Sequence, residues 1–377
     1  MAGHFSSLLA AAPDPADRVP VTVLTGFLGS GKTTLLNRLL ALPDLAGTAV
    51  IVNEFGAIGI DHDLIAQTTE NTVLLANGCL CCAVRGDLVQ ALCDLAERGT
   101  PSGVPLDQVL IETSGLADPG PILHTLMGEP AVRARFALAG VACTVDAVLG
   151  MGTLDRHPES VKQLAVADQV FLTKTDLLPA AGCLALRERV QAICPGALFH
   201  DDPGAYPQAL RDLLRSPATE QVARTASQAA FMRPVGSAAP VPGGARAHSD
   251  GITSFTIVRD EPLPREGFAA WLDMLTAMRG DDLLRVKGIV CLAEQPDQPL
   301  VIHGVQHLFH PPVSLPAWPG PDRRTRIVFI TRGIDAQSLD ETLSVLARRR
   351  PRAGGAPPPS GGALPPSTPL YRTSETS

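Results

Sequence analysis

The sequence has no long apolar run and no basic N-terminus. No window offers about 18 or more uninterrupted apolar residues, the length that a membrane-spanning helix requires, so we expect no membrane partner. The chain begins Met1-Ala-Gly-His-Phe-Ser-Ser-Leu-Leu-Ala10, without Lys or Arg before the short apolar stretch, which makes a poor signal peptide. These two absences predict a cytoplasmic protein.

Basic residues are also fewer than acidic residues. Lys and Arg number 31 against 38 Asp and Glu, which gives a formal net charge of −7. A nucleic-acid partner held by a broad basic surface needs clustered Lys and Arg, so none is expected, whereas a small anionic ligand is compatible. In a large chain without a secretory signal, a cluster among the 8 cysteines indicates metal binding rather than disulfides.

The sequence divides into five segments. A chain of 377 residues predicts two or three domains. We expect a flexible N-terminus over residues 1–18, a first domain over 19–222 and a linker rich in Pro and Gly over 223–250. A smaller α+β domain should follow over 251–350, with a disordered tail rich in Pro, Gly, Ser and Thr over 351–377.

The first domain alternates short apolar runs with helical patterns, which is typical of an α/β fold with a mostly parallel sheet. Its expected strands are Val21–Leu24, Thr48–Val52, Thr72–Leu75, Gln108–Ile111, Val141–Val145, Gln169–Leu172 and Ala197–His200. Its expected helices are Thr33–Leu42, Asp87–Arg98, Pro121–Leu126 and Val161–Ala167. In the second domain the expected strands are Ile252–Val258, Gly288–Leu292, Pro299–His303 and Arg326–Ile330. Its expected helices are Phe268–Met278 and Ala336–Arg349.

Residues 26–33 carry a phosphate-binding motif. The sequence Gly26-Phe-Leu-Gly-Ser-Gly-Lys-Thr33 fits the pattern G-x-x-x-x-G-K-[ST] between an expected strand and an expected helix. Its glycines let backbone N–H groups surround phosphates, while Lys32 would neutralise the β- and γ-oxygens and Thr33 would ligate Mg²⁺. An ordinary glycine-rich turn is the alternative. The motif predicts a P-loop domain whose nucleotide-binding residues are Gly26, Gly29, Ser30, Gly31, Lys32, Thr33 and Thr34.

A second motif, Val109-Leu-Ile-Glu112-Thr-Ser-Gly115, is an apolar strand that ends in an acid, with a glycine three residues later. In P-loop enzymes such a strand faces Mg²⁺. Glu112 could hold a magnesium-bound water, and Gly115 could donate its N–H to the γ-phosphate. We therefore name Lys32, Glu112 and Gly115 as catalytic residues. The alternative is an acid that only caps the end of a strand.

A third motif, Phe171-Leu-Thr-Lys-Thr-Asp176, places an Asp after another strand. The carboxylate of Asp176 could accept hydrogen bonds from N1–H and the exocyclic amine of guanine, a pair of donors that adenine lacks. Lys174 and Asp176 are therefore assigned to guanine recognition, although Thr173 stands where many GTPases carry Asn. A solvated Lys and Asp in a loop is the alternative.

Three thiols lie within four positions in Asn77-Gly-Cys-Leu-Cys-Cys82, at Cys79, Cys81 and Cys82. Thiolates bind soft or borderline ions such as Zn²⁺, Co²⁺ or Cu⁺ with high affinity. A tetrahedral site needs a fourth ligand, for which Glu54, His62 or a water is a candidate. Buried structural thiols or a redox pair are the alternatives.

The remaining cysteines and three histidines give weaker indications of metal binding. His303, His307 and His310 would share a face in a helix and could then form a second metal site. Gly304 and the β-branched start of the segment favour a strand that runs into a loop and scatters them, so a functional role and plain surface histidines both stay open. Isolated cysteines among apolar residues are interpreted as core fillers; these are Cys93, Cys143, Cys183, Cys194 and Cys291.

Together these residues resemble the CobW family of P-loop GTPases, a group of metal chaperones and metal-insertion proteins. The resemblance covers most of the chain. In the first domain it includes Thr25-Gly-Phe-Leu-Gly-Ser-Gly-Lys-Thr-Thr34, Asn53-Glu-Phe-Gly56 with Ile60-Asp61, Cys79 to Cys82, Glu112-Thr-Ser-Gly-Leu-Ala-Asp-Pro119 and Thr173-Lys-Thr-Asp176. In the second it includes Gly251-Ile-Thr-Ser-Phe255, Arg285-Val-Lys-Gly288, Gly304-Val-Gln306 and Val328-Phe-Ile330.

The resemblance implies that the three cysteines bind metal beside the nucleotide, and that the GTP state controls metal affinity and client contact. In sequence the cysteines lie between residues 53–61, a candidate switch I, and the strand that ends at Glu112. Loss of the γ-phosphate could therefore loosen the metal site. The long His-rich stretch of some members is absent, which argues against metal storage.

The resulting hypothesis is a GTPase that uses Mg²⁺, with Thr33 as a ligand, and holds Zn²⁺ or Co²⁺ on Cys79, Cys81, Cys82 and Glu54. Hydrolysis of the guanine nucleotide would release the metal to a client metalloprotein. One rival is a small-molecule kinase, which should prefer ATP and carry an Arg-rich lid; no lid is evident in the sequence, and a kinase does not explain the cysteines. A second rival is a nucleotide-controlled scaffold with a structural metal. The sequence favours no oligomeric state.

Overall fold

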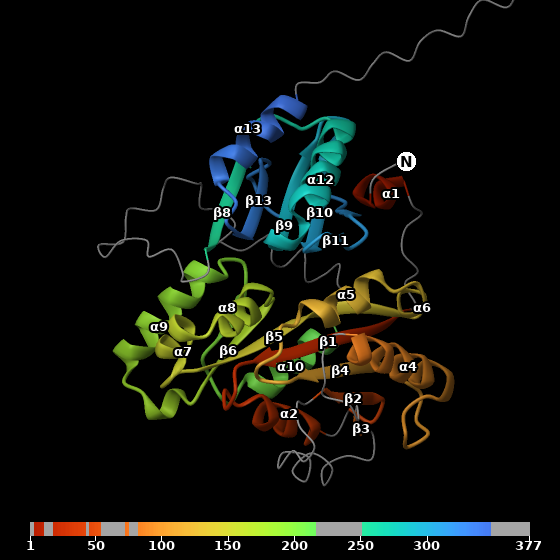
Figure 1. Cartoon of the computed structure of the whole chain (residues 1–377), viewed down its shortest axis with the longest axis vertical. Coiled ribbons are helices and arrows are strands. Elements are labelled where there is room, and N and C mark those ends of the chain that lie inside the picture. The colour runs from red at the N-terminus through yellow and green to blue at the C-terminus, as the bar shows by residue number, and fades with distance from the viewer. Residues whose placement is uncertain are drawn as a thin grey trace, which may run out of the picture.

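A computed structural model describes residues 4–10, 18–42, 45–53, 72–74, 82–215 and 251–347. In Figure 1 the elements from β1 to α10 form one domain, drawn in red to green, and those from β8 onward form a second, in teal to blue. The predicted linker and tail lie outside the described residues. None of the helices in the described ranges combines the length and the apolar character that crossing a membrane requires.

The first domain is built on a seven-stranded sheet in the order β3-β2-β4-β1-β5-β6-β7. Every pairing in it is parallel. The strands are β1 (Val19–Gly26), β2 (Thr48–Asn53), β3 (Thr72–Leu74), β4 (Gln108–Thr113), β5 (Phe136–Asp146), β6 (Gln169–Thr173) and β7 (Leu198–His200). Because the carboxyl ends of parallel strands meet at one edge, the loops that follow them gather there.

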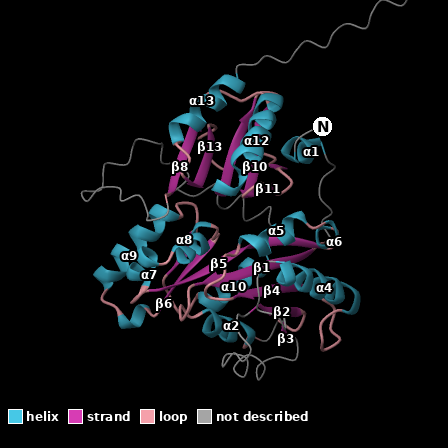
Figure 2. Ribbon diagram, viewed as in Figure 1, coloured by secondary structure: helices cyan, strands magenta, loops and turns pink. Residues whose placement is uncertain are grey.

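Helices cover both faces of this sheet, as Figure 2 shows. They are α2 (Lys32–Leu40), α4 (Cys82–Arg98), α5 (Gly120–Gly128), α6 (Pro130–Arg133), α7 (Gly150–Arg156), α8 (Pro158–Ala165), α9 (Ala180–Ile193) and α10 (Tyr206–Arg215). Successive side chains of a strand point to opposite faces. Accordingly, Val21 and Val23 pack with α4 and α5, whereas Leu24 packs with α2 and α10.

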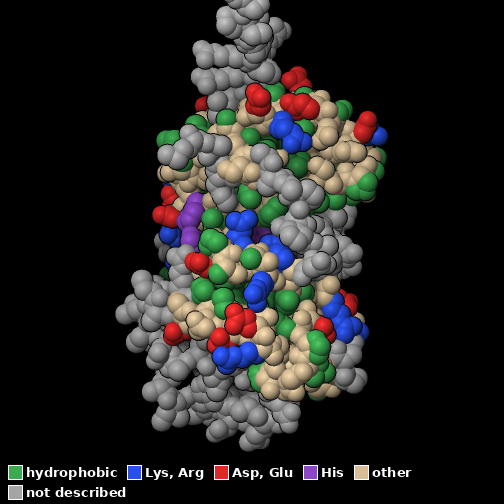
Figure 3. All heavy atoms as spheres, turned by 90° about the vertical axis from the view of Figure 1, so that its right-hand side faces the viewer, with side chains coloured by type: hydrophobic (Ala, Val, Ile, Leu, Met, Phe, Trp, Pro, Cys, Tyr) green, Lys and Arg blue, Asp and Glu red, His purple; other side chains and the backbone are tan. Residues whose placement is uncertain are grey.

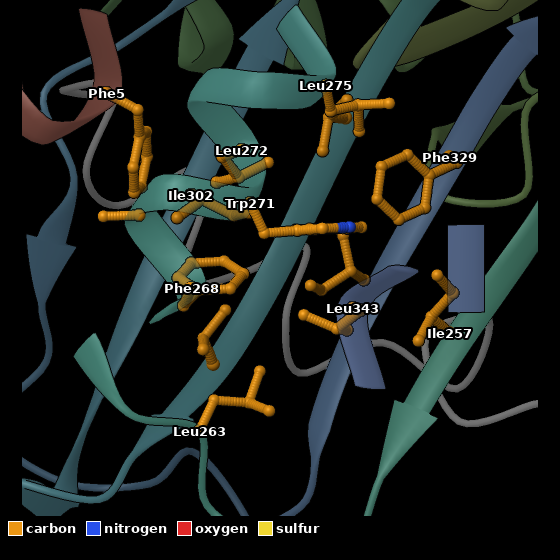
Figure 4. Close-up of a cluster of buried hydrophobic side chains, with 14 of the residues drawn as sticks. Phe5, Ile257, Leu263, Phe268, Trp271, Leu272, Leu275, Ile302, Phe329 and Leu343 are labelled. Atoms are coloured by element: carbon orange, nitrogen blue, oxygen red, sulfur yellow. The ribbon is translucent and has the colours of Figure 1, made fainter. Parts of the chain in front are cut away.

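The second domain is an antiparallel sheet covered by helices, in the order β11-β10-β9-β13-β8 with β12 paired to β10. Its elements are β8 (Ile252–Arg259), α12 (Arg265–Arg279), β9 (Leu283–Leu292), β10 (Gln295–Val305), β11 (Leu308–Phe309), β12 (Val313–Ser314), β13 (Thr325–Arg332) and α13 (Ala336–Ala347). Its core centres on Trp271 of α12, which meets Phe329 edge-on at 6.0 Å between ring centroids (Figure 4). The predicted fold class is thereby confirmed.

Residues 4–10 differ from the expectation of a flexible N-terminus over residues 1–18. They form helix α1, which lies beside the second domain in Figure 1. Phe5 is fully buried there and packs edge-on against Phe268, and its backbone N–H donates to Asp273 Oδ1 at 2.6 Å. A helix this short is not stable alone in water, so its contacts with the second domain hold it.

Other elements differ from expectation mainly at their ends. β5 begins at Phe136 rather than Val141, and α4 begins at Cys82 rather than Asp87. Helices α9 and α10 were not expected from the sequence, yet both cover the sheet and bury apolar side chains against it.

Candidate nucleotide-binding site

The phosphate loop lies at the carboxyl end of β1, the central strand of the sheet. β1 ends at Gly26 and α2 begins at Lys32, with left-handed φ angles of 67° at Gly29 and 91° at Gly31. A Cβ on Gly26 would overlap the hydroxyl of Thr144, so this position has no room for a side chain. The amino end of α2 follows the loop directly, and its N–H groups and helix dipole favour an anion there, which fits a nucleotide phosphate.

Side chains at the ends of β5 and β6 hold the phosphate loop in place. Ser30 is almost fully buried, and its hydroxyl lies 2.6 Å from the Thr144 hydroxyl of β5. The Thr173 hydroxyl, at the end of β6, donates to the Ser30 carbonyl at 2.7 Å. The loop is thus held in shape before any nucleotide binds, which lowers the entropic cost of binding.

Lys32 folds back over the loop. Its Nζ donates to the carbonyls of Gly26 at 2.9 Å and Phe27 at 3.2 Å, and only 8% of the residue is exposed. Charged phosphate oxygens are stronger acceptors for an ammonium group than neutral carbonyls are. The lysine therefore lies where it could bind the phosphates. Thr34, the third residue of α2, is exposed.

The structure brings Thr33 and Glu112 together, although 79 positions separate them in sequence. β4 is the parallel neighbour of β1, with Glu112 opposite Leu24. The Thr33 hydroxyl donates to Glu112 Oε1 at 2.9 Å, and Glu112 is only 5% exposed. A hydroxyl and a carboxylate at the phosphate loop form an oxygen donor set of the kind that Mg²⁺ prefers.

The segment between β4 and α5 lies against the phosphate loop. A Cβ on Gly115 would come within 2.7 Å of the Leu28 backbone, so only glycine allows this approach. Gln163 of α8, fully buried, donates its Nε2 to the carbonyls of Gly115 at 3.1 Å and Ala117 at 3.0 Å. The segment is therefore held against the phosphate loop, and Gln163 is a contributor that the motifs did not reveal.

The loop that the sequence assigns to guanine recognition follows β6. Lys174 adopts φ 58°, an uncommon value for a residue with a side chain. Its Nζ lies 2.5 Å from Oδ2 of Asp146, at the end of β5, whose other carboxylate oxygen accepts the backbone N–H of Val148 at 2.8 Å. Asp176 is exposed in a short 3₁₀ turn, Thr175–Leu177, where it can meet a base.

Asp146 and Tyr206 support this loop and were not named from the sequence. The signal for Asp146 was an acid directly after an apolar strand, the same signal that identified Glu112. Tyr206, on α10, donates its hydroxyl to the Leu172 carbonyl of β6, and burial raises the pKa of the phenol so that it remains a neutral donor.

The Cys-x-Cys-Cys site lies largely outside the described residues. Glu54, His62, Cys79 and Cys81 fall in undescribed ranges, and only the backbone of Cys82 is described, as the first residue of α4. Within the described ranges no three His, Cys, Asp or Glu side chains gather in a way that could hold a metal ion. The metal site therefore stays a prediction from the sequence.

The three histidines of the second domain separate into two environments. His303 of β10 and His310 stack with ring centroids 4.7 Å apart, and His303 is buried rather than on the surface. His307 lies in the turn between β10 and β11, and its Nε2 is 2.9 Å from Nε2 of His124 on α5. The three do not form one site.

Comparison with known proteins follows the same division into domains. Residues 20–201 match the family described as CobW/HypB/UreG, nucleotide-binding domain, and residues 252–347 match the cobalamin synthesis protein cobW C-terminal domain. The zinc chaperone YjiA of Escherichia coli (strain K12) is 32% identical over 324 residues, which cover 83% of this chain and 93% of that protein. The zinc-regulated GTPase metalloprotein activator 1 of Saccharomyces cerevisiae is 27% identical over 368 residues, 86% of this chain and 83% of the relative.

A solved structure agrees with these relatives. The crystal structure of Zn(II)-bound YjiA GTPase from E. coli superposes with a TM-score of 0.61 and 26% identity, over 87% of this chain and 99% of that one. The resemblance inferred from the motifs is confirmed, and the chain belongs to the CobW family of nucleotide-binding proteins.

Proposed function

We propose that this protein is a GTPase that binds Zn²⁺, or alternatively Co²⁺, at Cys79, Cys81 and Cys82 and transfers it to a client metalloprotein. The observation that carries the proposal is the contact between Thr33 and Glu112 at 2.9 Å, which links the phosphate loop to the strand leading into the Gly115 segment. Relatives named as zinc chaperones and as a zinc-regulated GTPase metalloprotein activator support it.

The nucleotide-site residues have distinct roles in this proposal. When a nucleotide binds, Lys32 Nζ would leave the carbonyls of Gly26 and Phe27 and donate to the β- and γ-phosphate oxygens. Glu112 and Thr33 would hold Mg²⁺. A bound Mg²⁺ supplies positive charge that offsets the charge developing on the phosphates. Gly115 presents its backbone N–H toward the γ-phosphate. Gln163 keeps that segment in place through the carbonyls of Gly115 and Ala117.

Guanine recognition rests on the loop after β6. Asp176 offers two carboxylate oxygens to the N1–H and exocyclic amine of guanine. Lys174, held by Asp146, keeps the loop in its left-handed turn beside the base. Adenine presents no matching pair of donors, which disfavours the small-molecule kinase and its expected ATP preference.

The order of the strands supports coupling between the nucleotide-binding site and the proposed metal site. β2, β4 and β1 are adjacent parallel strands, and Glu54 follows β2 directly in sequence. Cys82 begins α4, which packs on the same sheet. In sequence, the proposed metal-binding segment therefore lies between a strand of this sheet and a helix that packs on it. In the proposed cycle, loss of the γ-phosphate releases the Gly115 segment and weakens metal binding, as in other nucleotide-controlled switches.

The test is the Zn²⁺ affinity of the purified protein with a non-hydrolysable GTP analogue and with GDP, measured by competition with a chelator. We expect tighter Zn²⁺ binding with the GTP analogue than with GDP, and loss of that difference in Cys81→Ala. Cys183→Ala, on α9 away from the motif, is the matched control. Equal affinity in both nucleotide states would exclude the chaperone cycle, and metal that stays bound stoichiometrically through hydrolysis would favour the structural scaffold.

A further inference from the structure

A pair of histidines joins the two domains at their boundary. His124 lies on α5 of the nucleotide-binding domain, and His307 lies in the turn between β10 and β11 of the second domain. Their Nε2 atoms are 2.9 Å apart, with ring centroids at 4.9 Å and planes at 59°. Figure 3 shows histidine side chains, in purple, on the surface at this boundary. We propose that His124 and His307 form a second metal site, for a divalent ion such as Zn²⁺ or Cu²⁺, that bridges the two domains.

The separation of the two nitrogens suits a shared metal ion. Imidazole nitrogen binds Zn²⁺ at about 2.0–2.1 Å, so two such ligands at angles of roughly 90–110° lie about 2.8–3.4 Å apart. The observed 2.9 Å falls in that range. In the metal-free protein one ring donates its Nε2–H to the other, and a metal ion would replace that single proton. Imidazole is a ligand that suits Zn²⁺, Cu²⁺ and Ni²⁺.

The turn that carries His307 is rigidly placed. Val305 and Leu308, on either side of the turn, pack into the apolar core that lies against α5. Gln306 takes φ 54°, a strained value for a residue with a side chain, and its N–H donates to the Leu283 carbonyl at 2.7 Å. Strain of this kind is retained where surrounding contacts enforce it. The backbone that carries His307 is therefore fixed beside α5 before a metal arrives.

Two neighbouring residues, Gly280 and Asp281, lie close to His307. A Cβ on Gly280 would come within 2.7 Å of the His307 Cβ, so the glycine permits the close approach of the turn. Asp281, the next residue, places Oδ1 3.9 Å from His307 Nδ1. This distance exceeds that of a hydrogen bond, but a carboxylate on this side of the ring can move to accept the Nδ1 proton, which leaves the Nε2 lone pair for the metal. Asp281 is 96% exposed, so its effect is modest.

The site is open to solvent. The His307 side chain is 41% exposed, so water molecules can complete the coordination of a metal held by two imidazoles. An open coordination position also allows the ion to exchange. Because α5 directly follows the Gly115 segment, a bound ion would connect the second domain to the part of the chain that contacts the phosphate loop. The proposed site does not depend on the nucleotide cycle or on the three cysteines.

The test uses Zn²⁺ alone with full-length protein in which Cys79, Cys81 and Cys82 are changed to Ser. Calorimetry should show one Zn²⁺ bound by this protein. His307→Asn should weaken that binding at least roughly tenfold, and His124→Asn combined with His307→Asn should remove it. His200→Asn, at a half-buried histidine of β7, is the control and should leave the Zn²⁺ stoichiometry unchanged. Unchanged Zn²⁺ binding in the double variant would overturn the proposal.

Two further measurements separate metal binding from folding. Circular dichroism without metal checks that each variant stays folded. His307→Cys replaces the imidazole with a thiolate ligand, so it should retain the ion and give a new thiolate-to-Co²⁺ charge-transfer band that the Asn variant lacks. Absence of that band in a folded His307→Cys protein would count against the site. Failure of the nucleotide-dependent Zn²⁺ test in the wild type would leave this result unaffected.

Discussion

Arg285 of the second domain and Asp168 of the nucleotide-binding domain form a buried ion pair. Their side chains are 2% and 8% exposed, and Lys287 Nζ lies 2.7 Å from the same carboxylate oxygen. The second carboxylate oxygen accepts the Val141 N–H of β5 at 2.8 Å. Burial by itself would raise the pKa of Asp168, but Arg285 and Lys287 outweigh it and hold the pKa well below its usual range. The cluster therefore depends on an ionised carboxylate shared by two domains.

Asp168→Asn should destabilise the protein strongly. The change leaves Arg285 and Lys287 buried without a counter-charge, and removal of one partner from a buried ion pair costs about 3–5 kcal/mol. Arg285→Met should cost less, because Lys287 still pairs with the carboxylate. Urea unfolding followed by circular dichroism measures both free energies.

An exposed ion pair provides the control for this comparison. Arg187 and Asp201 lie 3.0 Å apart but are 41% and 53% exposed. Solvent screens such pairs, so Asp201→Asn should change the free energy of unfolding by less than about 1 kcal/mol. Equal effects of Asp168→Asn and Asp201→Asn would contradict a structural role for the buried cluster.

Glu112→Gln should raise the Mg²⁺ requirement of GTP hydrolysis. The carboxylate accepts the Thr33 hydroxyl and would orient the ligands of the ion, and loss of such supporting groups typically weakens metal binding roughly 10- to 100-fold. The half-maximal Mg²⁺ concentration should therefore rise by that factor. Thr33→Val should act in the same direction, whereas Thr33→Ser, which keeps the hydroxyl, should not.

Glu188→Gln, at an exposed acid of α9, is the control for the loss of one negative charge. An unchanged Mg²⁺ dependence in Glu112→Gln would remove Glu112 from the ion site and leave it as the cap of a strand.

The sequence predicted the elements whose signals are local. The phosphate loop follows from a fixed spacing of glycines and lysine across a strand–loop–helix unit, and its geometry at Gly29 and Gly31 has the left-handed φ angles that only glycine adopts readily. Helix α10 was missed although Tyr206, Leu210 and Leu214 repeat at helical spacing, a pattern that predicts an amphipathic helix.

Long-range contacts were not predictable in the same way. Gln163 reaches the Gly115 carbonyl from 48 positions away, and Asp168 meets Arg285 across 117 positions. Nothing in the local pattern around these residues distinguishes them from solvated polar side chains. Phe5 is a similar case, since its partner Phe268 belongs to a domain at the other end of the chain.

Asp176→Asn should weaken GTP binding and improve use of XTP. Guanine loses hydrogen bonds to a charged group, each of which contributes about 1.5–3 kcal/mol, so KM for GTP should rise at least roughly 10- to 100-fold. Xanthine carries an oxygen in place of the exocyclic amine and can accept a hydrogen bond from the Asn amide. Steady-state kinetics with GTP, XTP and ATP measures this change.

Asp146→Asn tests the support of the same loop. It removes the charge that holds Lys174 at 2.5 Å, so KM for GTP should rise by a smaller factor while kcat changes little. Asp155→Asn, at an exposed ion pair with Arg189, is the control. A fall in kcat without a change in KM would contradict the role of Asp146 in base recognition.

Two stacked histidines of the second domain, the buried His303 and the half-buried His310, should make stability fall in mildly acidic solution. Burial, followed by the charge of Arg285, lowers the pKa of His310 to about 4, and burial also places the pKa of His303 well below its usual range. At pH 7 both histidines are neutral in the folded and unfolded states. As the pH falls from about 6.5 toward 4, only the unfolded chain gains these protons, so the free energy of unfolding decreases.

The size of the effect can be tested with one substitution. For His310 alone, the decrease between pH 7 and pH 5 should be on the order of 2 kcal/mol. His310→Phe keeps an aromatic ring against His303 but cannot titrate, so its urea unfolding should depend less on pH by that amount. The carboxylate of Asp168 titrates below this window and does not contribute to the difference. If His310→Phe keeps the full pH dependence of the wild type, His310 is not held neutral by its surroundings, and the acid sensitivity must come from other groups.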